Sequence, residues 1–136
     1  MATKTAKYTY GLGRRKAATA RARLYKSKTA GEITINDKPA LEYLSGNKTL
    51  LAEITDPLAV SNKQKEYSIT VRVSGGGLSG QVDAIKLAIA KALTTDASDL
   101  RPLLKKAGMM KRDPREKERK KYGLRSARKK EQFSKR

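Results

Sequence analysis

Charge is distributed very unevenly along this 136-residue chain, and its distribution limits which parts fold into a body of their own. Residues 1–28 carry nine Lys and Arg and no acidic residue. Residues 29–100 carry seven basic and nine acidic residues, whereas residues 101–136 carry sixteen basic and four acidic ones. A near-neutral middle between two cationic ends predicts a small folded body with segments that bind a polyanion. Because like charges repel, we expect the bound polyanion to contribute much of the working stability.

The composition excludes several kinds of functional site. The chain has no Cys and no His, so it lacks a thiol nucleophile, a disulfide framework, a Cys zinc site and the usual general base. It has no apolar stretch of about 18 residues, and residues 1–7 lack the apolar run of a secretory signal. We therefore expect one domain that is not an enzyme, with no cofactor, no metal and no membrane partner.

Four segments have the residue pattern of β-strands: 7–10, 18–25, 32–35 and 67–73. We expect the first to end at the glycine cluster 11–13, because glycines commonly break strands. In the second, small apolar residues alternate with Arg21, Arg23 and Tyr25, which places these three on one face. Ala is a poor strand former, so a helix is the competing interpretation. We prefer a strand because a helix would place the two arginines roughly 200° apart.

Four further segments are predicted to be helical: 40–44, 48–54, 78–93 and 100–107. Pro39 fits the first turn of the first helix, and Asn47 is a suitable N-cap for the second. We expect Pro57 to stop the second helix. Gly108 is well placed to end the last helix in the left-handed conformation.

Apolar periodicity ends at Met109, which predicts a globular domain over residues 1–108 and an extended basic tail over residues 109–136. By its composition the tail is a disordered basic arm, or a localisation signal, that needs a polyanion to become ordered. Fully extended, about 26 residues span roughly 85–90 Å. Such an arm reaches well beyond the body.

A glycine-rich loop, residues 75–80, joins a predicted strand to the long helix, an arrangement that typically binds phosphate. It lacks the Gly-Lys-Ser/Thr ending of a P-loop. A small kinase with such a loop needs several metal-binding carboxylates, and only Asp83 lies on the following helix. We favour a contact to a nucleic-acid phosphate, with a purely structural turn as the alternative and a bound nucleotide as the weakest interpretation.

A second candidate site contains Arg14, Arg15 and Lys16 together with Arg21 and Arg23. No acidic residue interrupts the first 28 residues, so a merely solvated face is the weaker interpretation. Guanidinium groups suit bidentate phosphate contacts. Three tyrosines, at positions 8, 10 and 25, could stack on bases, although packing within the protein is favoured.

Four motifs follow one another along essentially the whole chain: Gly-Leu-Gly-Arg-Arg-Lys at 11–16, Gly-Gly-Gly-Leu-Ser-Gly-Gln at 75–81, Leu-Arg-Pro-Leu-Leu-Lys-Lys-Ala-Gly at 100–108 and Gln-Phe-Ser-Lys-Arg at 132–136. Together with residues 113–123, they resemble the family of the universal ninth protein of the small ribosomal subunit. The resemblance implies an α/β fold. It is expected to be a two-layer sandwich, a mixed four-stranded sheet with helices on one side, followed by a long basic tail.

The resemblance also implies a function. Such a protein is a structural constituent of the small ribosomal subunit that binds ribosomal RNA in the subunit head and supports translation. Its tail is expected to reach the anticodon stem-loop of peptidyl-site tRNA. Neighbouring ribosomal proteins of the head are further expected partners, and no homo-oligomer is expected. The expected location is the cytoplasmic ribosome, or an organellar ribosome in the stroma or matrix.

The residues expected to contact ribosomal RNA are cationic or belong to the glycine loop: Arg14, Arg15, Lys16, Arg21, Arg23, Gly75, Gly76, Gly77, Ser79, Lys111, Arg112, Arg115, Arg119, Lys120, Lys121, Arg125, Arg128, Lys129 and Lys130. The residues expected to contact tRNA are the last three: Ser134, Lys135 and Arg136. Glu131 stands where the family often has a proline or another non-acidic residue. We therefore expect no phosphate contact at that position.

The main alternative is a free-standing basic nucleic-acid chaperone or architectural binder, which needs the charge but not the ordered motifs. Stable co-sedimentation with the small subunit separates the two functions. A small kinase is a third alternative, and an absence of nucleotide binding would dispose of it.

Overall fold

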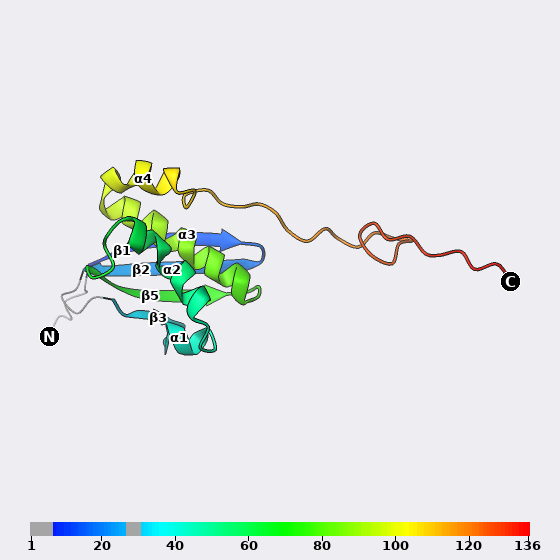
Figure 1. Cartoon of the computed structure of the whole chain (residues 1–136), viewed down its shortest axis with the longest axis horizontal. Coiled ribbons are helices and arrows are strands. Elements are labelled where there is room, and N and C mark those ends of the chain that lie inside the picture. Colours follow the sequence, from blue (N-terminus) through cyan, green and yellow to red (C-terminus); the bar gives the residue numbers. More distant parts are fainter. Residues whose placement is uncertain (1–6, 27–30) are drawn as a thin grey trace.

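The fold is an α/β sandwich, seen in a computed structural model that describes residues 7–26 and 31–136. Its elements are β1 (Tyr8–Arg15), β2 (Ala18–Lys26), β3 (Ile33–Ile35), β4 (Lys38–Pro39), α1 (Ala40–Tyr43), α2 (Lys48–Val60), β5 (Tyr67–Ser74), α3 (Leu78–Asp96), the 3-10 turn η1 (Ser98–Leu100) and α4 (Arg101–Lys106) (Figure 1). The prediction of no secretory signal concerns residues 1–7, of which the structure describes only Lys7.

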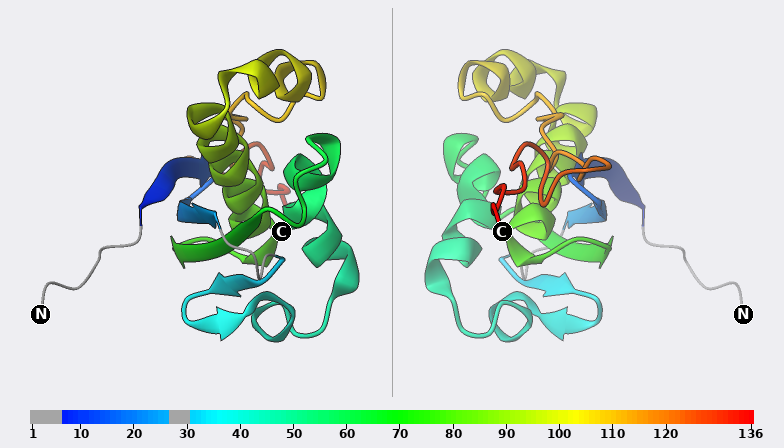
Figure 2. Two further views of the ribbon diagram at one scale, coloured as in Figure 1. Left: turned by 90° about the vertical axis from the view of Figure 1, so that its left-hand side faces the viewer. Right: turned by 90° about the vertical axis from the view of Figure 1, so that its right-hand side faces the viewer.

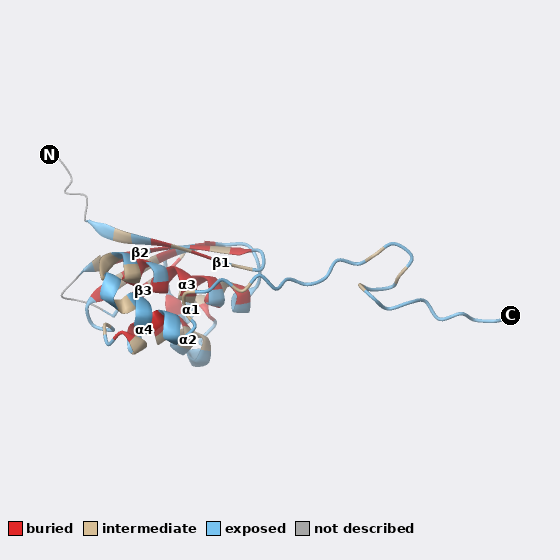
Figure 3. Ribbon diagram, turned by 90° about the horizontal axis from the view of Figure 1, so that it is seen from above, coloured by how far each residue is buried: buried red, intermediate tan, exposed pale blue. Residues whose placement is uncertain are grey.

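The sheet has the order β1-β2-β5-β3-β4, and the helices cover one of its faces (Figure 2, Figure 3). The pairs β1–β2, β2–β5 and β3–β4 are antiparallel, whereas β3 and β5 are parallel. The mixed α/β class predicted from the sequence is therefore confirmed. The sheet has five strands rather than four, because Lys38 and Pro39 pair with β3 at its edge. An edge position tolerates a proline, which has no N–H to donate.

Strand β1 does not end at the glycines, and that prediction is wrong. The strand continues through Gly11 and Gly13 to Arg15, paired with β2 along its whole length. A Cβ atom at Gly13 would lie 1.9 Å from the carbonyl oxygen of Ala84, and one at Gly11 would lie 2.0 Å from that of Ala88. These glycines therefore let helix α3 lie directly on the strand instead of forming a turn.

Helix α2 also continues past the residue that was expected to stop it. Asn47 caps the helix as predicted, since its side chain accepts hydrogen bonds from the N–H groups of Thr49 and Leu50. The helix then runs through Pro57 to Val60. A proline costs the helix one hydrogen bond, but Pro57 is buried together with Leu58 on the side that faces the core. Burial offsets the lost bond.

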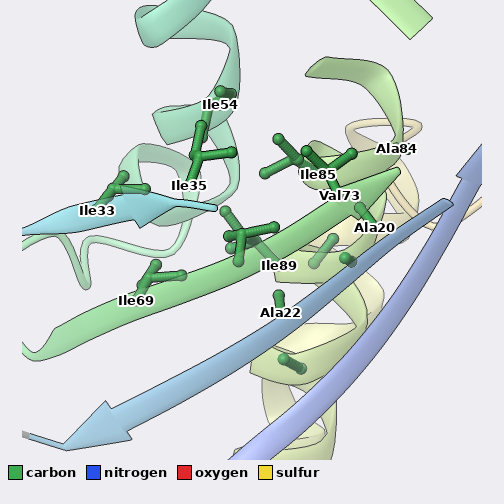
Figure 4. Close-up of a cluster of buried hydrophobic side chains, with 14 of the residues drawn as sticks. Ala20, Ala22, Ile33, Ile35, Ile54, Ile69, Val73, Ala84, Ile85 and Ile89 are labelled. Atoms are coloured by element: carbon green, nitrogen blue, oxygen red, sulfur yellow. The ribbon is translucent and has the colours of Figure 1, made fainter. Parts of the chain in front are cut away.

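The core lies between the sheet and helix α3. Ile85, Ile89 and Leu93 of α3 are fully buried. Ile85 and Ile89 lie beside the small side chains Ala20 and Ala22 of β2 (Figure 4). Each fully buried Ile or Leu stabilises the fold by about 1.5–3 kcal/mol. Alanines on β2 bring the helix close, and only the opposite face of the sheet remains uncovered.

Beyond α4 the chain has no helix or strand, and it leaves the body as one long segment (Figure 1). Gly108 has the left-handed conformation predicted for it, with a φ of +74°. The division into domains at residue 108 stays a prediction. Among the helices of residues 7–26 and 31–136, none is long and apolar enough to cross a membrane.

Candidate nucleic-acid interface

The uncovered face of the sheet carries cationic and aromatic side chains. Alternation along β2 directs Arg21 and Arg23 away from the helices, because Ala20, Ala22 and Leu24 are buried on the other side. In the sheet, Arg23 stands opposite Tyr10 of β1, and Arg21 stands between Leu12 and Arg72. The predicted common face of Arg21 and Arg23 is confirmed. Arg72 adds a third arginine beside them.

A groove of about 270 Å³ lies on this face. It is lined by the three arginines together with mostly polar and aromatic neighbours: Tyr10, Arg21, Arg23, Tyr25, Thr34, Asp37, Thr70, Val71 and Arg72. Its single carboxylate, that of Asp37, lies 3.6 Å from a guanidinium nitrogen of Arg72. The groove keeps an excess of positive charge and hydrogen-bond donors that suit phosphate and sugar.

The tyrosines of this face are not part of the core. The side chains of Tyr8 and Tyr10 are exposed, by 44% and 46% of the residue respectively. The rings of Tyr8 and Tyr25 pack against each other with centroids 5.6 Å apart, and the guanidinium carbon of Arg23 lies 5.1 Å from the centroid of Tyr8. Packing is therefore one role of Tyr8 and Tyr25. Tyr10 lines the groove.

In the glycine loop, Gly75 and Gly76 serve the fold, Gly80 is buried, and residues 77–79 are exposed. Gly75 and Gly76 have left-handed backbone angles, and a Cβ at Gly75 would lie 2.4 Å from the carbonyl oxygen of Ala17. This close approach packs the loop against the β1–β2 turn. Gly77, by contrast, has open space around its Cα, and Ser79 is exposed. The interpretation as a structural turn thus applies to Gly75 and Gly76, whereas a phosphate contact stays a prediction for Gly77 and Ser79.

Gln81 holds this loop in place, a role that was not predicted from the sequence. Its side-chain amide donates to the carbonyl oxygen of Gly75 at 3.1 Å, and its amide oxygen accepts from the hydroxyl of Tyr43 at 2.8 Å. The motif at residues 75–81 contains this glutamine. The position of Gln81 in the sequence gave no sign that its side chain bonds to the backbone of the loop.

The two adjacent arginines at the end of β1 have different environments. Arg14 is exposed, whereas the side chain of Arg15 is only 13% exposed. The Arg15 Nε atom lies 3.3 Å from Oδ2 of Asp83, and its Nη2 atom lies 3.0 Å from Oδ2 of Asp113. Its Nη1 atom donates to the carbonyl oxygen of Arg115 at 2.8 Å. Arg15 is thus bound by the protein itself.

The tail cations fall into two groups. Arg112, Arg115, Lys121 and Arg128 form ion pairs with acidic residues of the tail. The other tail cations that were expected to contact ribosomal RNA are exposed and form no ion pair within the described part of the chain: Lys111, Arg119, Lys120, Arg125, Lys129 and Lys130. The last three residues are exposed at the far end (Figure 1).

The structure thus distributes the predicted site residues over three places. Arg14, Lys16 and the loop residues 77–79 lie at one end of the body, where β1 and the start of α3 meet. Arg21 and Arg23 lie on the uncovered sheet face. The tail residues lie along a separate segment. The missed neighbour Arg72 alternates with the buried residues of β5, a signal already present in the sequence.

Comparison with known proteins decides the family. Residues 13–136 match the family model described as ribosomal protein S9/S16. The chain belongs to the ribosomal protein S9 family. Its relatives include the small ribosomal subunit protein uS9 of Synechococcus sp. strain JA-2-3B'a(2-13), which is 50% identical over 127 residues, covering 93% of this chain and 92% of the relative. The uS9 of Solidesulfovibrio magneticus is 49% identical, covering 93% and 95%.

The uS9 of Mesomycoplasma hyopneumoniae strain 7448 is 49% identical, covering 93% of this chain and 94% of the relative. The predicted family is therefore confirmed. Members of the ribosomal protein S9 family are structural proteins rather than enzymes, so the prediction that this chain has no enzymatic activity is confirmed by the family.

Proposed function

We propose that this member of the ribosomal protein S9 family is a constituent of the small ribosomal subunit, whose body binds ribosomal RNA and whose tail reaches peptidyl-site tRNA. The relatives at 49–50% identity are named small ribosomal subunit proteins, and they align with nearly the whole chain. The observation that carries the proposal is the division of cationic residues between an uncovered sheet face and a long exposed tail. In this role the protein works in the ribosome of the cytoplasm, or in that of an organelle.

The body offers two surfaces for RNA. On the sheet face, Arg21, Arg23 and Arg72 line a groove that suits a phosphate backbone, and Tyr10 offers a ring for an unpaired base. At the end of the body, Arg14 and Lys16 stand beside the exposed loop residues 77–79. Backbone contacts of this kind hold a protein in register on folded RNA without reading its sequence.

The tail offers its contacts one after another along an extended segment. Its exposed cations that form no ion pair within the described part of the chain suit RNA phosphates on either side of the path. Lys135 and Arg136 present an ammonium and a planar guanidinium at the far end of this segment. A phosphate clamp of this kind accepts every tRNA, since it reads no base.

The first test concerns the body. Changing Arg21 and Arg23 to Ala is expected to weaken binding to small-subunit ribosomal RNA and to lower the slope of log K against log salt by about one unit per lost contact. The matched control changes Lys48 and Lys65 to Ala, which removes the same charge outside the groove. Equal losses in the two variants would mean that charge alone binds RNA, as in a general chaperone.

The second test concerns the end of the tail. Deleting residues 134–136 is expected to leave incorporation into the subunit intact and to weaken peptidyl-site tRNA binding several-fold, because two phosphate contacts are lost. Changing Lys129 and Lys130 to Ala removes the same positive charge further from the end and serves as the matched control. Unchanged tRNA affinity together with unchanged reading-frame maintenance would refute the tRNA contact.

A further inference from the structure

We infer that Arg15 is a positioning residue that fixes where the tail leaves the body, rather than a contact to RNA. The inference rests on the proposed function only where it predicts an effect of the anchor on tRNA binding. The anchor itself is a property of the free protein. It consists of Arg15 from β1, Asp83 from α3, and residues 113–115 at the start of the tail.

The direction of Arg15 follows from the strand that carries it. Because β1 continues through Gly13, successive side chains point to opposite faces of the sheet. Arg14 therefore points to the uncovered face, and Arg15 points to the face that packs against α3. There it meets Asp83, about one turn into the helix. The close approach at Gly13, where a Cβ would touch Ala84, brings the strand near enough for this ion pair.

All three guanidinium nitrogens of Arg15 are engaged. Nε pairs with Asp83 at 3.3 Å, Nη2 pairs with Asp113 at 3.0 Å, and Nη1 donates to the carbonyl oxygen of Arg115 at 2.8 Å and more weakly to that of Asp113 at 3.4 Å. These partners are 68 to 100 residues away in the sequence. Each nitrogen of this largely buried group thus already has a protein acceptor, so Arg15 joins protein to protein.

The tail side of the anchor is rigid in its own right. The carboxylate of Asp113 accepts from the backbone N–H of Arg115 at 2.9 Å and from its guanidinium Nη2 at 2.8 Å. Pro114 between them fixes its own φ. The turn at 113–115 thus presents two carbonyl oxygens and one carboxylate oxygen to Arg15 at once. Only a planar fork matches three such acceptors, and an ammonium group at this position does not.

The anchor matters because a long segment of chain extends beyond it. About 20 residues separate Arg115 from the chain end, and a flexible segment of that length samples a large volume. A fixed starting direction raises the effective concentration of the last residues along one path. Without the anchor, the last contacts of the tail with the body would be those of Met109 and Met110, which pack against the core. The tail end would then reach its target less often, although no contact at the target had changed.

The first experiment measures the anchor in the free, full-length protein. The chain has no native Cys, so Lys91→Cys on α3 and Lys117→Cys just after the anchor define a unique spin-label pair. We expect a narrow distance distribution in the otherwise native protein and a broad one in Arg15→Lys, Arg15→Gln and Asp113→Asn. Arg14→Gln, the neighbour that faces the other way, is expected to stay narrow. Circular dichroism confirms that each variant is folded.

Asp113→Asn keeps the proposal testable if the Arg15 variants fail to fold, because Asp113 belongs to the tail. A broad distribution in the native protein, or a narrow one in Asp113→Asn and in every folded Arg15 variant, would overturn the anchor. The result does not depend on the ribosome, so it stands even if the proposed tRNA contact is refuted.

The second experiment measures the consequence in assembled small subunits. Arg15→Lys and Asp113→Asn are expected to lower peptidyl-site tRNA affinity roughly three- to ten-fold, in the direction of the deletion of residues 134–136, while the salt slope of ribosomal RNA binding by the body stays unchanged. If Arg15 contacts RNA instead, Arg15→Gln lowers that slope by about one unit and Asp113→Asn leaves tRNA affinity intact. That pattern would contradict the proposal. If deleting residues 134–136 leaves peptidyl-site tRNA affinity unchanged, the proposed tRNA contact is refuted. The spin-label distances then still decide whether the anchor exists.

Discussion

In the body, Ile85, Ile89 and Leu93 are enclosed completely by the sheet and its neighbours, whereas in the tail Tyr122 and Phe133 are exposed by 103% and 88%. Few charged residues lie near the first group, and cations surround the second. The body is therefore positioned by apolar burial and close backbone contact. The start of the tail is positioned by Met109 and Met110, which pack partly buried against the core, and by the contacts of Arg15 with residues 113–115. No residue after Met110 belongs to the core.

This difference shows why a chain of net charge +19 keeps a folded part at all. The near-neutral segment 29–100 supplies most of the core residues, and the cations of β1 and β2 point away from it or pair with acids. Beyond the anchor the tail contributes no side chain to the core, and we expect a polyanion to order it. Changes in the two regions should therefore act on different measurements.

The largest effect is expected where strand and helix touch. Gly13→Ala places a Cβ 1.9 Å from the carbonyl oxygen of Ala84, so the strand and the helix must separate. We expect a loss of about 3 kcal/mol or more in the free energy of unfolding, measured by urea denaturation. Gly77→Ala is the matched control, since its surroundings are open and its φ is −103°. A loss below about 1 kcal/mol in Gly13→Ala would contradict the close packing.

A smaller effect on the free energy of unfolding is expected to distinguish the body from the tail. Ile89→Val removes one methylene group from a fully buried side chain and is expected to cost about 1 kcal/mol of unfolding free energy. Phe133→Ala removes a much larger group from the tail and is expected to change that free energy by less than about 0.5 kcal/mol. Thermal or urea unfolding followed by circular dichroism measures both. A similar cost in both variants would mean that Phe133 packs against the body.

The smallest effect concerns the acid at the anchor. A hydrogen bond from the Arg115 side chain lowers the pKa of Asp113 from its ordinary value of 3.8 to about 2. Because the pKa is lowered in the native state, the contact of the ionised Asp113 stabilises the native protein above pH 3.8. This contribution is lost as the pH falls through about 2. We expect carboxyl NMR to give a titration midpoint near 2 in the native protein and one closer to 3.8 in Arg115→Gln. Equal midpoints would contradict the contact.

The regular elements of the body could largely be predicted from the sequence. Strand β2 and helix α3 were predicted because their apolar residues repeat with periods of 2 and of 3.6. The extent of β1 could not be, since Gly11 and Gly13 look like strand breakers until the helix that they contact is known. Pro57 was wrongly expected to end helix α2 for a related reason, because its burial against the core becomes evident only in the assembled fold.

Some features of the candidate site could be predicted from the sequence and others could not, and the difference again depends on how far β1 extends. Arg21 and Arg23 were placed on one face because alternation within β2 was evident. Arg14 and Arg15 were grouped together because a strand that ends at the glycines leaves both in a turn, so their opposite directions were missed. The partnership of Arg15 with Asp113 spans 98 residues and has no signal in the local sequence.

Crosslinking in cells tests most directly the claim that the body and the tail meet different RNAs. A photoreactive group at Tyr10, in the groove of the sheet face, is compared with one at Phe133, and the captured RNA is sequenced. We predict that position 133 captures tRNA anticodon arms and nearby small-subunit ribosomal RNA, and that position 10 captures ribosomal RNA without tRNA. The same spread of messenger RNA or DNA from both positions would contradict the account and indicate a general polyanion binder.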